Sequence, residues 1–243
     1  MVTTATCGQS SAVSTRRTSL YGVWNGFLGF LMGNLDLGRQ DDLIFNGSPA
    51  TITEAPFMAY IDASFADGSS AACSASVVGE QWILTAAHCV VDKNNVSATR
   101  ATAYVGNAQK KIGESHAADK IIPNAAFDKN NFLNGHDIAL LHLGTPLTFT
   151  PSIQPICFPT TDAVLGKVIS ACDQKIYGWG NVDSAGTTRT DFLQKLDVTV
   201  SADVSSCTSL TDETIICVRG DVANSGACYG VPKDSDPPPQ NMA

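Results

Sequence analysis

The chain alternates short apolar runs with clusters of polar and turn-forming residues. Runs rich in valine, isoleucine, threonine and aromatic residues predict β-strands at Phe57–Ile61, Thr102–Val105, Ile138–Leu143, Val168–Tyr177 and Leu196–Val200. The last run alternates strictly between apolar and polar residues, which is typical of a strand with one buried face. Clusters such as Lys93–Asn95 and Asp128–Asn131 separate the runs and predict turns. Because no sustained helical periodicity appears after the first 43 residues, we expect an all-β protein.

The composition indicates a substantial core and an acidic surface. Of the 243 residues, 44% are hydrophobic and 16% are charged, and the formal net charge is −8 at pH 7. A chain of this length suits one β-barrel-type domain with a leader. We expect no nucleic-acid partner, because the chain is acidic and has neither a basic patch nor a glycine-rich phosphate-binding loop.

Residues 1–43 precede the predicted strands and form a separate segment. They contain the apolar stretch Leu20–Leu31 behind Arg16-Arg17. This stretch is too short for a membrane helix and has the length of a signal-peptide core. We expect residues 1–43 to be a leader or propeptide that includes a signal segment, and we expect no membrane anchoring.

The segment with the most chemical content is Trp82-Ile83-Leu84-Thr85-Ala86-Ala87-His88-Cys89. Its apolar run ends in a histidine followed by a cysteine, and Cys73 lies 16 residues before Cys89. If the two cysteines form a disulfide, it would hold the loop that carries His88. A general base needs that rigidity, because proton transfer works only within hydrogen-bond reach. The alternative is a core histidine beside a structural cysteine.

The segment resembles the histidine motif of the chymotrypsin-like serine proteases (peptidase family S1). Other segments are similar to family motifs in the same order: Ile44-Phe45-Asn46-Gly47, Pro56-Phe57, His136-Asp137-Ile138-Ala139-Leu140-Leu141, Tyr177-Gly178-Trp179-Gly180, Ile215-Ile216-Cys217 and Ala227-Cys228-Tyr229-Gly230. The resemblance implies a protease domain at residues 44–230, built from two packed six-stranded antiparallel β-barrels. It also implies a serine endopeptidase that acts on protein or peptide substrates and needs no cofactor.

The resemblance assigns roles to individual residues. His88 would take the proton of the nucleophile and pass it to the leaving amine, while Asp137 would orient the imidazole and stabilise its cation. Gly230 aligns with the oxyanion hole. Gly226 aligns with the base of the primary specificity pocket, where a glycine implies an apolar or small substrate side chain. No metal site is expected. A metal site made of His88, His136 and Asp137 is disfavoured, because neighbours on a strand point to opposite faces.

The chain departs from the family at the nucleophile. The family has Gly-Asp-Ser-Gly-Gly-Pro after the cysteine that matches Cys228, whereas this chain continues from Gly230 as Val231-Pro232-Lys233-Asp234-Ser235. Pro232 stands at the position of the serine and has no N–H, so the hydroxyl and one oxyanion donor are both lost. Ser235 follows an aspartate as the family serine does, but three residues later and before three prolines that favour an extended backbone.

Residues 231–243 are therefore expected to be a non-homologous, proline-rich tail, and the second barrel is expected to be incomplete at its C-terminus. Every valine codon begins with GT, the usual start of an intron, and the match ends at Val231 in the middle of a motif. We expect the tail to be translated intron. The alternative is a catalytically inactive homologue that acts as a binding or regulatory protein.

The resemblance also bears on the cysteines and on activation. It implies the disulfides Cys73–Cys89 and Cys207–Cys217, while Cys157 could pair with Cys7 unless a signal peptide removes the latter. Disulfides are typical of oxidising compartments, so we expect a secreted protein. The family is made as zymogens that are cut before the position of Ile44. Here Gln40-Asp41-Asp42-Leu43 precede it, so a trypsin-like activator would find no basic residue.

Overall fold

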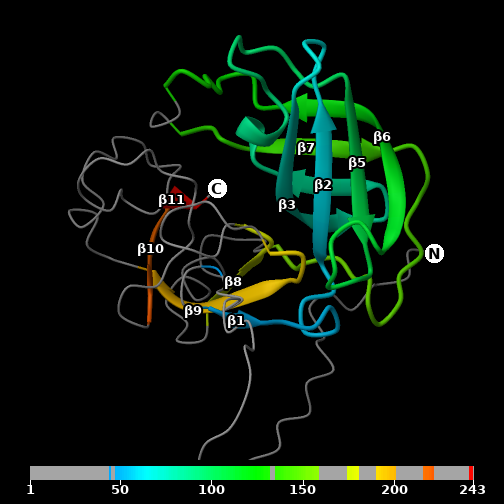
Figure 1. Cartoon of the computed structure of the whole chain (residues 1–243), viewed down its shortest axis with the longest axis vertical. Helices are drawn as coiled ribbons and strands as arrows, with labels where there is room; N and C mark the ends of the chain where they lie inside the picture. Colours follow the sequence, from blue (N-terminus) through cyan, green and yellow to red (C-terminus); the bar gives the residue numbers. More distant parts are fainter. Residues whose placement is uncertain are drawn as a thin grey trace, which may run out of the picture.

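The computed structural model describes residues 44, 47–131, 135–158, 174–180, 190–200 and 216–221, and the backbone of 241–242. Figure 1 shows them as a closed barrel with a smaller sheet beside it. Among these residues the only helical element is a single 3-10 turn, η1 (Ala87–Cys89). The predicted all-β class is confirmed. No helix in this part of the chain is long and apolar enough to span a membrane.

Six antiparallel strands close the barrel in the order β2-β3-β4-β7-β6-β5. Their bounds are β2 (Met58–Ser64), β3 (Ser70–Gly79), β4 (Trp82–Thr85), β5 (Arg100–Val105), β6 (Glu114–Pro123) and β7 (Ala139–Leu143). Each strand pairs with two neighbours, so the barrel has no open edge. The register shifts within β3 between Val77 and Gly79 and within β6 between Ala118 and Lys120. Such irregularities bend strands, as closing a small barrel requires.

Alternate residues of each strand fill the barrel. In β7, for example, Ala139, Leu141 and Leu143 are buried while Leu140 and His142 face outward. The interior combines small side chains with a few large ones, namely Ala59, Ile61, Ala63, Ala75, Val77, Ile83, Ala101, Ala103, Val105, Ala139, Leu141 and Leu143. The many alanines suit the narrow space inside a six-stranded barrel, where large side chains cannot all be accommodated at native packing density.

Each of the five predicted strands overlaps an observed one, and the apolar runs missed the other six strands of the described residues. The predicted strands correspond to β2, β5, β7, β8 (Gln174–Gly178) and β9 (Gln194–Val200). Three of the missed strands are β3, β4 and β6 of the barrel, and the other three belong to the smaller sheet. β3 is rich in alanine and serine, which have little β-propensity. One expectation was wrong: His136 and Asp137 precede β7 instead of lying on a strand, and His136 has a φ of 61°.

The smaller sheet is organised around β9. This strand pairs with β8, with β1 (Ser48–Pro49) and with β10 (Ile216–Gly220), and β10 pairs with β11 (Asn241–Met242). The side chain of Ile44 is buried against Ile176, Leu196 and Val198 of this sheet. The described strands form an open sheet, so the closure or incompleteness of a second barrel stays a prediction. The bounds of the leader, the protease domain and the tail also stay predictions.

Trp179 joins the barrel to the smaller sheet. Its indole N–H donates to the carbonyl of Ala108 at 2.8 Å, and its backbone N–H donates to Oγ of Ser74 at 3.1 Å. Its ring meets the ring of Tyr60 edge-on, with the centroids 5.8 Å apart. Since Trp179 is only 5% exposed, these contacts fix the orientation of the Gly-Trp-Gly turn against the barrel.

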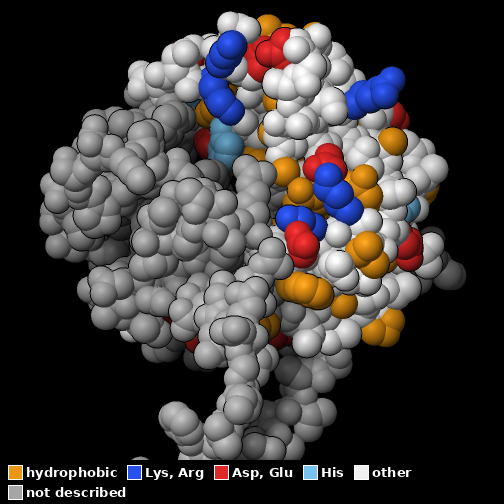
Figure 2. Space-filling view, viewed as in Figure 1, with side chains coloured by type: hydrophobic (Ala, Val, Ile, Leu, Met, Phe, Trp, Pro, Cys, Tyr) orange, Lys and Arg blue, Asp and Glu red, His pale blue; other side chains and the backbone are white. Residues whose placement is uncertain are grey.

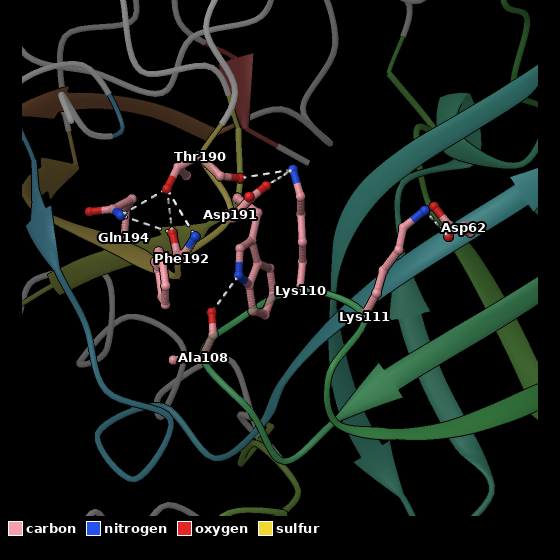
Figure 3. A network of polar contacts seen from close by, with 9 residues as sticks. Asp62, Ala108, Lys110, Lys111, Thr190, Asp191, Phe192 and Gln194 are labelled. Atoms are coloured by element: carbon pink, nitrogen blue, oxygen red, sulfur yellow. Dashed lines mark hydrogen bonds and ion pairs between the residues drawn. The ribbon is translucent and has the colours of Figure 1, made fainter. Parts of the chain in front are cut away.

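Two consecutive lysines attach the loop between β5 and β6 to both parts of the structure (Figure 3). Lys110 donates to the carbonyl of Thr190 and forms an ion pair with Asp191 at 2.8 Å, just before β9. Lys111 forms an ion pair with Asp62 of β2 at 2.6 Å. Because these pairs are partly exposed, each contributes little to stability, and their main effect is to orient the loop.

The inside–outside assignment of β7 can be tested by substitution. Leu141→Ala should lower the free energy of unfolding by about 2–5 kcal/mol, because the side chain is fully buried and its removal leaves a cavity. Leu140→Ala, on the outer face of the same strand, is the control and should cost clearly less. Urea unfolding of the three proteins measures both losses. Equal losses would contradict the assignment.

Candidate active site

Strand pairing brings His88 and Asp137 together. β4 ends at Thr85, which pairs with Ala139, the first residue of β7. Because the two strands are antiparallel, the chain that leaves β4 and the chain that enters β7 lie at the same end of the barrel. His88 lies three residues after that pair on one strand, and Asp137 lies two residues before it on the other. Residues 49 positions apart in the sequence therefore become neighbours.

Two hydrogen bonds join His88 to Asp137. Nδ1 of the imidazole lies 2.6 Å from Oδ2 of the carboxylate, and the backbone N–H of His88 donates to Oδ1 at 2.8 Å. The side chains are 22% and 20% exposed, respectively. With its Nδ1–H donated to the carboxylate, the neutral ring carries its acceptor lone pair on Nε2. An imidazole held in this way can act as a general base.

The environment of Asp137 favours its charged form. Burial is the largest single influence and by itself would raise the pKa of the carboxyl. The hydrogen bonds from the ring and the backbone of His88, with the nearby charge of Lys129, outweigh burial and lower the pKa below its ordinary value. Asp137 is thus a carboxylate at neutral pH, as an acceptor for the imidazole must be.

The disulfide Cys73–Cys89 ties β3 to η1 beside His88. It is one of the two disulfides that the family resemblance implies. Nε2 of His88 lies 3.4 Å from Sγ of Cys89, a disulfide sulfur with no proton to donate. The two sulfurs and His88 are close enough together to hold a metal ion. We discard that possibility, because the sulfurs are joined to each other and are not the thiolates that bind metals.

Lys129 contacts the backbone of His88. Its Nζ donates to the backbone carbonyl of His88. Burial lowers the pKa of Lys129, while attraction to Asp137 and Asp92 acts in the opposite direction. The sequence predicts only a turn at this residue. The signal available was a repeat, since Asp-Lys-Asn-Asn occurs at both 92–95 and 128–131.

A cavity of about 280 Å³ opens beside His88. Its lining comes from the connection between β2 and β3, from residues 91–93 and from Lys129. The charged groups in the lining are of both signs: Asp67, Asp92, Lys93 and Lys129. In Figure 2 a basic side chain, a histidine and a carboxylate group lie together at the border of the described surface. The cavity offers space for a ligand next to the imidazole.

The other predicted site residues are not brought to this site by the part of the structure that is described. Gly226, Gly230, Ser235 and Cys207 lie outside the described residues, and only the backbone of Cys217 is described, in β10. Their roles and the pairing Cys207–Cys217 stay predictions. Cys157 is disulfide-bonded, but Cys7 lies outside the described residues, so that pairing also stays a prediction.

Comparison with known proteins identifies the family. The family model for trypsin matches residues 44–231, which is most of the chain. The chain belongs to the trypsin-like serine proteases. A solved structure of HL collagenase superposes with a TM-score of 0.62 at 26% identity, over 81% of this chain and 79% of that one.

Curated relatives agree with this assignment. Serine protease SSP1 of Scolopendra subspinipes is 27% identical over 73% of this chain and 61% of its own length. Coagulation factor IX of Oryctolagus cuniculus is 31% identical over 65% of this chain and 58% of its own length. The match therefore spans about three fifths of the length of these two relatives.

Removal of the Cys73–Cys89 disulfide should destabilise the protein. A cross-link between cysteines 16 residues apart restricts the unfolded chain by about 3 kcal/mol. The double variant Cys73→Ala and Cys89→Ala should lose roughly that amount in urea unfolding. A much smaller loss would contradict the disulfide, as would a wild-type protein whose unfolding free energy does not change when it is first reduced.

The His88–Asp137 pair should make stability depend on acid pH. The pKa of Asp137 is lower in the folded state than the ordinary value of 3.8. Its contribution is thus present above that value and is lost as the pH falls through the folded-state pKa. The difference in unfolding free energy between wild type and Asp137→Asn should be constant near neutral pH and shrink below about pH 4. Urea unfolding between about pH 7 and pH 2.5 measures it; a difference that grows on acidification would contradict the assignment.

Proposed function

We propose that the protein is a serine endopeptidase that hydrolyses peptide bonds with His88 as general base and Asp137 as its orienting carboxylate. The observation that carries this proposal is the double hydrogen bond between the two residues, at 2.6 and 2.8 Å. It occurs in a chain of the trypsin-like family, in which a histidine and an aspartate with this relation activate a serine.

In the proposed reaction His88 removes the proton of a serine hydroxyl through Nε2 as the oxygen attacks the substrate carbonyl. The resulting imidazolium is stabilised by Asp137 and protonates the leaving amine, and water then repeats the sequence to release the acid. We place the serine in the loop after Gly230, where the backbone N–H of that glycine would help to bind the oxyanion. This chain has Val231-Pro232 at that point, so its own activity depends on whether a serine follows Gly230 in the native protein.

The substrates we propose are proteins or peptides cleaved after a small or apolar side chain, with Gly226 at the base of the pocket. The cavity beside His88 would receive a substrate residue next to the scissile bond. We also propose that the protein is secreted. The Cys73–Cys89 disulfide and the disulfide-bonded state of Cys157 support an oxidising compartment.

The second candidate is a catalytically inactive homologue that binds a partner through the protease surface. The observation in its favour is Pro232, which has neither a hydroxyl nor a backbone N–H where the family has its serine. Folding around the His88–Asp137 pair does not require the nucleophile, so an inactive homologue could keep this geometry.

Labelling of the native protein with a fluorophosphonate probe distinguishes the two candidates. For the endopeptidase we expect the label on a serine in a Gly-Asp-Ser-Gly-Gly peptide that follows Gly230, identified by mass spectrometry. His88→Ala should slow the labelling by at least about a thousandfold, because the hydroxyl then lacks its base.

His142→Ala is the matched control for this experiment. His142 also pairs with an aspartate at 2.6 Å, but that partner is Asp119 on the outer surface of the barrel, so the labelling rate should not change. An unlabelled protein whose last peptide ends in Pro-Pro-Pro-Gln-Asn-Met-Ala would instead establish the tail and support the inactive homologue.

A further inference from the structure

The turn that carries Lys129 is held by a second turn with the same sequence. Asp-Lys-Asn-Asn occurs at 92–95 and at 128–131, and the two copies contact each other. Nδ2 of Asn95 donates to Oδ1 of Asp128, and the backbone N–H of Lys129 donates to Oδ1 of Asn95, both at 2.8 Å. Asn95 has a φ of 59°, a left-handed conformation that asparagine adopts more readily than most residues.

Each turn is also closed by its own aspartate. Oδ1 of Asp92 accepts hydrogen bonds from the backbone N–H groups of Asn94 and Val96, both at 2.8 Å. Oδ1 of Asp128 accepts one from the backbone N–H of Asn130 at 3.0 Å. The hydrogen bond from Asn95 is the main cause that lowers the pKa of Asp128. The paired turns are therefore locally ordered, and they determine where the side chain of Lys129 begins.

Lys129 donates a hydrogen bond to a backbone carbonyl of η1, that of His88. Because η1 is a single turn, the carbonyl of His88 lies in its last turn, where backbone carbonyls accept hydrogen bonds from groups outside the helix. A lysine side chain can satisfy such a carbonyl, and Nζ of Lys129 does so. The charged groups around this ammonium are Asp92, Asp137 and His88, with Asp67 and Lys93 also in the lining of the cavity.

We infer that Lys129 is a positioning residue for the His88–Asp137 pair, an inference that rests on the proposed function. Asp137 holds His88 by its backbone N–H and its ring, and Lys129 holds it by its carbonyl. With the peptide units on both sides of the His88 Cα bonded, the imidazole has little freedom to tilt away from a substrate. The ammonium charge also favours the carboxylate form of Asp137, on which the ring orientation depends.

The test compares Lys129→Met with Lys129→Arg in the full chain. Methionine keeps much of the length but removes the donor and the charge, while arginine keeps both. Carbon-13 NMR of the Asp137 carboxyl, assigned with Asp137→Asn, should show a higher titration midpoint in Lys129→Met and a nearly unchanged one in Lys129→Arg. This readout needs no substrate and no nucleophile, so it remains valid even if the probe labels nothing.

Lys93→Met is the matched control for this titration. Lys93 has the same position in the first turn and lines the same cavity, but its charge lies near Asp67. Its removal should leave the midpoint of Asp137 where it is. An equal rise in Lys93→Met and Lys129→Met would overturn the inference, as would an unchanged midpoint in Lys129→Met.

Kinetics provide a second readout if the protein cleaves a peptide substrate. Lys129→Met should lower kcat by roughly tenfold or more with little change in KM, because a displaced catalytic group affects the reaction more than substrate binding. Lys129→Arg should restore most of the loss. A purely structural role would lower the melting temperature of both variants and leave kcat per folded molecule unchanged, which would overturn the inference.

Asn95→Gly keeps the test open if Lys129→Met does not fold. Glycine accepts the positive φ at this position but removes both side-chain bonds to the second turn. The charge and the donor on Lys129 stay in place, but the turn that aims them is released. We expect the midpoint of Asp137 to rise and kcat to fall, each less than in Lys129→Met; no change in either would contradict the inference.

Discussion

The antiparallel pairing of β4 with β7 is the constraint on which the candidate active site depends. The pair Thr85–Ala139 lies at the end of the barrel where the chain leaves β4 towards His88 and enters β7 from Asp137. A shift of this register by one residue would exchange the inward and outward faces of β7, so that Leu141 and Leu143 would face solvent. Burial of these side chains in the barrel therefore protects the geometry of the two polar residues outside it.

Restraints of different kinds then converge on His88. The disulfide Cys73–Cys89 acts on the next residue through a covalent bond, Asp137 acts on the ring and the N–H, and Lys129 acts on the carbonyl. Together these contacts restrict both the backbone and the ring of His88. Catalytic groups require this kind of preorganisation, because a reaction tolerates little error in the position of its base.

The smaller sheet has a different relation to the site. Trp179 and Lys110 connect it to the barrel through directional bonds to backbone carbonyls of Ala108 and Thr190, and backbone hydrogen bonds between residues 108–110 and 191–193 add to them. In the proposed function this part of the chain supplies the nucleophile and the specificity pocket. In that proposal the departure from the family at Val231 affects the half that would complete the reaction, while the barrel keeps the hydrogen bonds between His88 and Asp137.

The amino-acid sequence by itself determined the family and the all-β class and predicted His88 and Asp137 as site residues, because contiguous motifs of apolar and polar residues carry that information locally. Local patterns found five strands but missed six, among them β3, in which alanine and serine hide the alternation. Only the tertiary structure decided that Asn95 and Lys129 belong to the surroundings of His88. Their side chains act across turns 34 residues apart, and the distance between those turns is set by barrel closure and strand register, which no local stretch of sequence encodes.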